Sequence, residues 1–213
     1  VALFVALLMT GVDDSGSEGS ETNQTTAETP GAKTAEVAKI DLDENETRAT
    51  FKDGKPVKEE RIGKKPFTIP GLAMEMLWCK PGTFTMGSPK SEKDRDDDET
   101  QHAVTLTQGY WLGKHEVTQS QWERVMGSNP SWFKGADRPV ETVAWHDATS
   151  FCEKLTEQER KAGRLPAGMS YQLPTEAQWE YACRAGTKTV HAFGEASGDM
   201  HRHGNYADRN TNF

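Results

Sequence analysis

Tryptophan is unevenly distributed along this chain, and the distribution limits where a hydrophobic core can form. Five of the six tryptophans lie between Trp111 and Trp179, and the sixth, Trp78, lies just ahead of them. Aromatic side chains dominate the energetics of protein cores because each one buries a large area. The folded domain is therefore expected to begin near Lys65 and to occupy residues 65–213.

The segment before this domain, residues 13–64, has the opposite character. It is rich in Ser, Thr, Glu, Gly, Lys and Asp, and Phe51 is its only aromatic residue. Such a segment cannot bury enough apolar surface to offset the conformational entropy lost on ordering. The composition predicts a disordered, acidic, Ser/Thr-rich linker, and no motif supports a recognition tail in its place.

An apolar run, Val1–Met9, stands at the start of the chain. The run is too short to span a bilayer, but it matches the apolar region of a secretory signal. Small residues and the linker follow it, and no cysteine follows that would favour a lipoprotein anchor. We interpret residues 1–12 as the remnant of a signal peptide, which predicts an exported protein of the periplasm, cell envelope or secreted fraction. The other interpretation is an isolated apolar terminus.

Charge and composition exclude two classes of partner. The chain of 213 residues has a formal net charge of −8, its apolar residues make up 34% of the sequence, and its mean hydropathy is −0.77. Binding to nucleic acid or to an anionic membrane surface requires a basic face. We therefore expect no nucleic-acid partner, and the shortness of the Val1–Met9 run predicts no membrane span in this chain.

Local patterns predict short strands in the first half of the domain. The apolar runs Met76–Cys79 and Thr83–Met86 flank Lys80-Pro81-Gly82, which indicates a β-hairpin with a Pro-Gly turn. Ala103–Thr107 alternates apolar residues with threonines, as a half-buried strand does, and Tyr110–Leu112 continues the sheet.

Three short helices follow, and two of them share a start signal. Thr118 with Gln121, and Thr175 with Gln178, are spaced as capping boxes, each followed by a tryptophan. The first helix is expected to end near Met126 and the second near Arg184. A middle helix is expected over residues 146–162, with an apolar stripe formed by Ala148, Phe151, Cys152 and Leu155.

No catalytic constellation is visible in these residues. Cys79, Cys152 and Cys183 include no CxxC pair, so a structural zinc site has little support, and core positions explain all three thiols. His201 and His203 could present two metal ligands on one side of a strand, but no third ligand accompanies them. Asp96–Glu99 lacks the spacing of an EF-hand loop and is interpreted as a solvated acidic loop.

Several longer phrases nevertheless occur together in the order of one enzyme family. They are GTFTMGS (Gly82–Ser88), EVTQSQW (Glu116–Trp122), NPSWFKG, RPVETVAW (Arg138–Trp145), ATSFC and LPTEAQWEYACRAG (Leu173–Gly186). With these phrases, residues 65–213 resemble the N-terminal portion of a formylglycine-generating-enzyme-like, or sulfatase-modifying factor, domain. The resemblance implies an α+β, irregular, C-type-lectin-like fold of this type, truncated, with short strands and three short helices.

The resemblance also carries expectations about chemistry. Active members of the family oxidise a sulfatase cysteine to formylglycine with copper and molecular oxygen, so a sulfatase polypeptide is the implied partner. The catalytic cysteine pair is expected downstream of Phe213, which implies that residues 1–213 alone are inactive and that copper belongs only to the complete protein.

Two further sites follow from the same resemblance. Cys152 and Cys183 match family positions that form disulfides with cysteines outside this chain. Asn205 and Tyr206 match a loop that holds structural calcium, although Asn205 is equally well explained as an ordinary turn residue. Outside the oxidase hypothesis, the resemblance also fits a non-catalytic, lectin-like binding module of an exported protein, or a general interaction domain of the cell envelope.

Overall fold

The computed structural model describes residues 8–11, 45–52, 55–93, 95–194 and 202–203. The chain divides into two compact units, each of which is formed by two separate stretches of sequence. The first unit combines Val1–Lys80 with Gly109–Leu173, and the second combines Pro81–Gln108 with Pro174–Phe213. Each unit contains β-sheet of its own.

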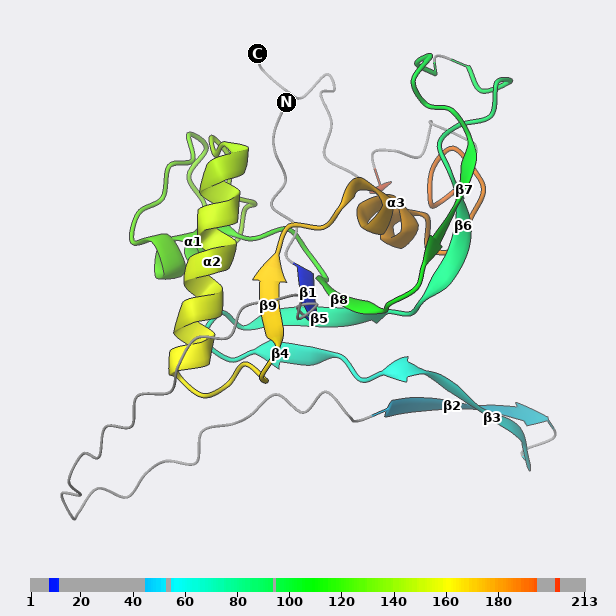
Figure 1. Ribbon diagram of the computed structural model, residues 1–213, viewed down its shortest axis with the longest axis horizontal. Coiled ribbons are helices and arrows are strands. Elements are labelled where there is room, and N and C mark those ends of the chain that lie inside the picture. The colour runs from blue at the N-terminus through cyan, green and yellow to red at the C-terminus, as the bar shows by residue number, and fades with distance from the viewer. Residues whose placement is uncertain (1–7, 12–44, 53–54, 94, 195–201, 204–213) are drawn as a thin grey trace, which may run out of the picture. The chain divides into compact units, whose positions relative to one another are not determined.

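A five-stranded antiparallel sheet forms the base of the first unit (Figure 1). Its strand order is β4 (Phe67–Ile69), β5 (Met74–Cys79), β8 (Tyr110–Gly113), β1 (Leu8–Gly11) and β9 (Met169–Gln172). Alternate side chains of a strand point to the same face. Met74 and Met76 are buried on one face of β5, and Trp111 and Tyr171 are buried at registers that place them on that same face.

Helix α1 (Gln119–Met126) of this unit begins as the sequence predicts. The Gln121 N–H donates to Thr118 Oγ1 at 3.3 Å, and the Thr118 N–H donates to Gln121 Oε1 at 2.9 Å, so the capping box is confirmed. Gly127 ends the helix with φ of 86°, a left-handed conformation that glycine adopts without steric cost.

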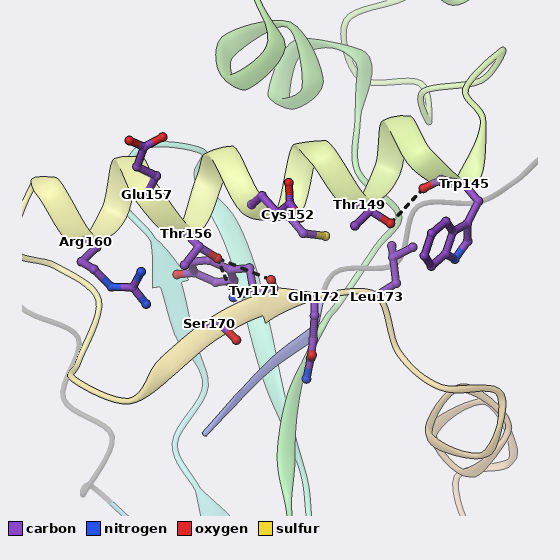
Figure 2. A pocket seen from close by; sticks show the side chains of 11 residues that line it. Trp145, Thr149, Cys152, Thr156, Glu157, Arg160, Ser170, Tyr171, Gln172 and Leu173 are labelled. Carbon is purple, nitrogen blue, oxygen red and sulfur yellow. Dashed lines mark hydrogen bonds between the residues drawn. The ribbon is translucent and has the colours of Figure 1, made fainter. Parts of the chain in front are cut away.

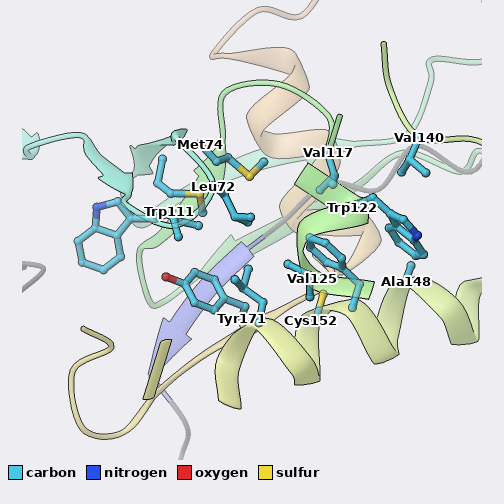
Figure 3. Packing of buried hydrophobic residues seen from close by; sticks show 14 of the residues in the cluster. Leu72, Met74, Trp111, Val117, Trp122, Val125, Val140, Ala148, Cys152 and Tyr171 are labelled. Carbon is cyan, nitrogen blue, oxygen red and sulfur yellow. The ribbon is translucent and has the colours of Figure 1, made fainter. Parts of the chain in front are cut away.

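Helix α2 (Trp145–Lys161) carries the predicted apolar stripe into the core (Figure 3). Phe151 stacks on Trp122 of α1 with ring centroids 5.1 Å apart. One continuous cluster joins both helices to the sheet; its members from the helices include Trp122, Val125, Ala148, Phe151, Cys152 and Leu155. The three predicted helices and this stripe are confirmed by the structure.

The second unit pairs β6 (Gly82–Met86) with β7 (His102–Leu106) and adds α3 (Glu176–Arg184). Phe84 meets Tyr181 of α3 edge to face at 5.3 Å between centroids. A Cβ atom at Gly82 would lie 2.4 Å from the Tyr181 hydroxyl, so a larger residue there would displace the Tyr181 side chain. The capping box of Thr175 and Gln178 at the start of α3 is confirmed.

The hairpin expected between Met76–Cys79 and Thr83–Met86 is wrong. Both segments are strands, but β5 pairs with β4 and β8, whereas β6 pairs with β7. The physical reason is burial: β5 buries alternate side chains and requires strands of a core sheet on both sides. All five residues of β6 are half-buried or exposed, which suits the equally exposed β7.

Two N-terminal segments also differ from the sequence-based expectation. Leu8–Gly11, within the segment interpreted as a signal remnant, forms strand β1 of the sheet. Part of the expected linker forms a two-stranded sheet of β2 (Asn45–Lys52) and β3 (Lys55–Lys64). Asp53-Gly54 between these strands is a hairpin signal that composition alone does not reveal. Residues 12–44 lie outside the described part of the chain, and cleavage of a signal peptide stays a prediction.

Candidate functional site

A groove runs between helix α2 and strand β9 in the first unit (Figure 2). Its volume is about 550 Å³, and it is lined by Trp145, Thr149, Cys152, Glu153, Thr156, Glu157, Arg160, Ser170, Tyr171, Gln172 and Leu173. Side chains of α2 tie this helix to β9 along the groove. Thr156 Oγ1 accepts the Tyr171 N–H at 2.9 Å, and the Arg160 guanidinium donates to the Met169 carbonyl at 3.1 Å. The floor of the groove is therefore held in a fixed geometry.

Cys152 lies at the floor of this groove and is only 2% exposed. Burial raises the pKa of its thiol to about 12, because the thiolate would lose its hydration there. Burial also raises the pKa of Cys79, although a hydrogen bond with Tyr110 opposes the shift. Since the thiolate is the nucleophile and the metal-binding form, neither thiol is prepared for chemistry at neutral pH.

The rim of the groove is aromatic and polar. Trp145 is 57% exposed at the first turn of α2. Farther along the same helix, Glu157 and Lys161 form an ion pair at 2.6 Å, and this pair lowers the pKa of Glu157. An exposed indole beside carboxylate, guanidinium and amide groups can bind a polypeptide segment, but it supplies no activated nucleophile.

A loop after α1 exposes two more aromatic side chains, Trp132 at 80% and Phe133 at 56%. The Gln119 side chain, which is 1% exposed, organises this loop from the inside. Its amide donates to the carbonyls of Phe133 at 2.9 Å and Pro139 at 3.3 Å. Its carbonyl oxygen accepts from the Asn129 amide at 2.9 Å and the Gly135 N–H at 3.0 Å.

Glu141 holds the same loop from the outside. Its carboxylate accepts the Phe133 N–H at 2.8 Å and also binds the Thr142 hydroxyl. The Thr142 hydroxyl is the main cause of a lowered Glu141 pKa, followed by the N–H of Phe133. Thr142 itself has φ of 59°, a region that a β-branched residue rarely adopts. Trp132 and Phe133 are thus displayed on a backbone that is fixed by hydrogen bonds rather than by their own burial.

A second concavity of about 460 Å³ lies within the second unit, and Cys183 and Trp179 of α3 line it. Cys183 is exposed. Phe193 stacks between His191 and His203, with centroid distances of 4.9 and 4.2 Å. Arg184 donates to Glu180 at 2.7 Å and to the Gly87 carbonyl at 3.0 Å, which fixes the wall of the concavity.

The predicted disulfide residues, Cys152 and Cys183, are both free and each lines a different concavity. The candidate calcium residues, Asn205 and Tyr206, lie outside the described residues, as does His201. Within the described residues, no three His, Cys, Asp or Glu side chains gather to hold a metal ion. Cu(I) prefers soft thiolate ligands. The protonated, buried thiols of Cys79 and Cys152 therefore do not fit this metal.

Sequence reasoning missed the loop that Gln119 and Glu141 support. A buried glutamine at the start of a helix has no distinctive local pattern, because its partners lie 10 to 20 residues away. The adjacent Trp132-Phe133 pair within a polar segment was the available signal. In the described residues, no helix has the length and apolar character needed to cross a membrane.

Comparison with known proteins identifies the family of the domain. Residues 64–212 match the model of the sulfatase-modifying factor enzyme 1-like domain. A chaperone protein, LppX, from Paenibacillus barcinonensis is 37% identical over 48% of this chain and 44% of its own length. The formylglycine-generating enzyme of Mus musculus is 32% identical over 40% of this chain and 18% of its own, and that of Mycobacterium tuberculosis is 36% identical over 35% and 20%.

The chain thus spans less than half the length of these curated relatives. Among solved structures, Treponema denticola variable protein 1 superposes with a TM-score of 0.53 and 26% identity. The likeness covers 64% of this chain and 62% of that chain. The mixed arrangement of three helices and short sheets agrees with the fold that the sequence predicts for this family.

Proposed function

Because this chain belongs to the sulfatase-modifying factor enzyme 1-like family, we propose that the complete protein oxidises a sulfatase cysteine to formylglycine. Within that enzyme, residues 64–194 serve as a scaffold and a polypeptide-binding surface. In the overall reaction, the substrate's sulfur leaves as hydrogen sulfide and its carbon is oxidised by two electrons to an aldehyde. Molecular oxygen takes these two electrons and two more from a thiol reductant, and is reduced to water. Copper, when bound to the complete protein, supplies the redox chemistry with oxygen.

The scaffold role rests on the protonation of the cysteines that the structure describes. Cys152 is almost fully buried, with a pKa of about 12, and the pKa of Cys79 is also raised. These thiols stay protonated at neutral pH and are therefore not activated nucleophiles. Cys183 is exposed, and the family resemblance assigns it to a disulfide rather than to the reactive pair. The reactive pair is thus assigned to cysteines other than these three.

The two concavities support a structural role for Cys152 and Cys183. Each thiol lines a space that a further segment of polypeptide could fill. We propose that each forms a disulfide with a cysteine of such a segment, with two protons and two electrons passing to a disulfide oxidant of the export compartment. Non-reducing peptide mapping of the complete protein tests this proposal, and recovery of both thiols unpaired contradicts it.

Calcium and export remain part of the proposal. Asn205 and Tyr206 would supply oxygen ligands, the kind of ligand that calcium prefers. We expect calcium to raise the melting temperature of the complete protein and Asn205→Ala to remove most of that increase. A calcium effect of equal size in both forms would rule out this site. Export is tested by fractionating the source cells, where recovery of the protein with the cytosol contradicts it.

An aldehyde assay tests the oxidase function. The complete protein is incubated in air with Cu(I), a thiol reductant and a cysteine-containing peptide of the sulfatase motif, and the aldehyde is detected by hydrazide labelling. We expect labelling with the complete protein and none with residues 1–213 alone. A matched peptide with serine in place of cysteine serves as the control for the thiol requirement.

A second function, a non-catalytic binding module, is favoured by the loop after α1 that exposes Trp132 and Phe133, here called the aromatic loop. Trp132 and Phe133 are exposed on a backbone that Gln119 and Glu141 hold rigidly. Rigid, exposed aromatic side chains are typical anchors of protein interfaces. The relative from Paenibacillus barcinonensis is named a chaperone protein, which suggests an unfolded polypeptide as the ligand.

The two functions give different results in a binding assay without copper. A binding module should suppress the aggregation of a reduced, unfolded model protein, and Trp132→Ala should weaken this effect several-fold. Val190→Ala is the matched control, because Val190 is an exposed apolar residue of the other unit. Equal suppression by both variants would exclude the aromatic loop as the binding surface.

A further inference from the structure

Two tryptophans of the five-stranded sheet form an aromatic corner around the ammonium group of Lys64. Trp78 of β5 pairs in register with Trp111 of β8, so both indoles lie on the same face of the sheet. Their ring centroids are 4.4 Å apart, and the two rings are inclined by 60°. The Lys64 Nζ lies 5.5 Å from the centroid of Trp78 and 5.2 Å from that of Trp111. One ammonium group therefore faces two indoles.

The two indoles of this corner are held by neighbours other than Lys64. Trp111 is 3% exposed, and Phe67 of β4 meets its ring edge to face at 5.9 Å between centroids. Trp78 lies directly against the main chain at Gly109, where a Cβ atom would be 2.2 Å from the indole. The orientation of both rings is thus fixed by the sheet, which makes the corner a preformed site.

The surroundings of Lys64 differ from those of Lys114, which follows β8 of the same sheet. Lys114 forms an exposed ion pair of 2.7 Å with Glu75. The ion pairs formed among the described residues do not include Lys64. The quadrupole of a tryptophan ring attracts a cation that lies within about 6 Å of its centroid, most strongly where water is excluded. Two indoles therefore face the Lys64 ammonium group where a carboxylate faces that of Lys114.

We propose that Trp78, Trp111 and Phe67 form a binding site for an alkylammonium group and that Lys64 is its built-in ligand. The site selects positive charge together with apolar carbon, a combination found in lysine side chains, methylated amines and choline. Because Lys64 is the last residue of β3, its binding also fastens the sheet of β2 and β3 to the five-stranded sheet. This proposal concerns binding and does not depend on the oxidase function.

The first test is nuclear magnetic resonance of the full chain, which reports whether Lys64 lies over the two rings in solution. Aromatic ring currents shift the signals of protons above the ring face upfield. We expect the ε-methylene protons of Lys64 to lie upfield of those of Lys114, and Trp78→Leu to remove most of this difference. Equal chemical shifts for the two lysines in the unaltered chain would overturn the proposal.

The second test supplies the ligand from solution. Lys64→Ala removes the built-in ligand, and the probes are choline and its uncharged analogue, in which carbon replaces the nitrogen atom. Binding is followed by tryptophan fluorescence at constant ionic strength. We expect choline to bind Lys64→Ala roughly three- to thirtyfold more tightly than the uncharged analogue, the factor that a cation–π contact supplies. The unaltered chain should bind choline several-fold more weakly than Lys64→Ala does, because Lys64 occupies the site.

Two further variants serve as controls for this titration. Gly109→Ala, combined with Lys64→Ala, displaces Trp78 and should abolish the preference for choline. Lys114→Ala removes a lysine beside the same sheet and should bind choline no better than the unaltered chain. Equal affinity of folded Lys64→Ala for choline and its uncharged analogue would overturn the proposal, as would an unchanged preference for choline in the folded double variant.

Discussion

The hydroxyl of Thr156 on α2 bonds to both main-chain groups of Tyr171 on β9. Thr156 Oγ1 accepts the Tyr171 N–H at 2.9 Å and donates to the Tyr171 carbonyl at 3.4 Å. A single side chain therefore closes the outer edge of the strand and fixes the helix along the groove. Sheet edges that remain open invite pairing with other chains, so this bond also limits association.

Replacement of Thr156 by valine tests the importance of this bond. The change keeps the shape of the side chain but leaves the Tyr171 N–H without its partner. We expect the free energy of unfolding to fall by about 1–3 kcal/mol, measured by urea denaturation. Thr149→Val is the control, because among the described residues the Thr149 hydroxyl bonds to the carbonyl of Trp145 in its own helix and to no group of β9. A loss of equal size in both variants would show that the bond to β9 has no special importance.

Among the residues that support the aromatic loop, Gln119 should cause the largest loss of stability when it is replaced. Gln119→Leu removes four hydrogen bonds and leaves several buried groups unsatisfied. We expect a loss of about 3 kcal/mol in the free energy of unfolding, together with faster amide exchange at Gly135. Gln158→Leu is the matched control, since within the described part of the chain its amide makes a single long bond, of 3.5 Å, to the Val125 carbonyl. Normal protection of Gly135 in Gln119→Leu would show that other contacts hold the loop.

The loop should also respond to acid. The Thr142 hydroxyl and the Phe133 N–H lower the pKa of Glu141 below its usual value of 4.5. Because the pKa is lower in the folded state, the contribution of this carboxylate is present above pH 4.5 and is lost as the pH falls through the lowered value. Amide exchange at Phe133, corrected for intrinsic rates, should therefore rise in this range. The rise should be absent in Glu141→Gln, and the same rise in that variant would exclude Glu141 as its cause.

The buried thiol of Cys152 should make the folded chain less stable as the pH rises above 9. Burial raises the folded-state pKa of Cys152 from 9.0 to about 12. The stability that this shift contributes is complete below pH 9 and is lost as the pH rises from 9 toward 12, because the unfolded chain deprotonates first. The unaltered chain should thus lose more stability between pH 9 and 11 than Cys152→Ala does. An equal loss of stability in the two chains over this pH range would show that Cys152 is not a buried, protonated thiol.

The helices were predictable because their signals are local. Thr118 with Gln121, and Thr175 with Gln178, are three residues apart, and the stripe of α2 repeats within one helix. Side-chain caps and apolar periodicity act over one or two turns, so a single sequence contains all the necessary information.

The sheet was not predictable in the same way. Strand β5 lies next to β6 in sequence but pairs with β8, whose residues are more than 30 positions away. Burial on the core face decided this pairing, and it appears only when the whole unit is assembled. Likewise, Gln119 and Glu141 became recognisable as supports of the loop only through partners brought together by the fold.

The proposed oxidase function assigns structural roles to Cys79, Cys152 and Cys183 and expects the reactive thiols elsewhere in the complete protein. The most direct measurement compares aldehyde formation by the complete protein with that of its Cys152→Ala and Cys183→Ala variants, expressed per folded molecule. Structural cysteines predict aldehyde formation by all three. Aldehyde formation by the unaltered protein with complete loss in a folded variant would contradict the claim, as would the absence of aldehyde from all three.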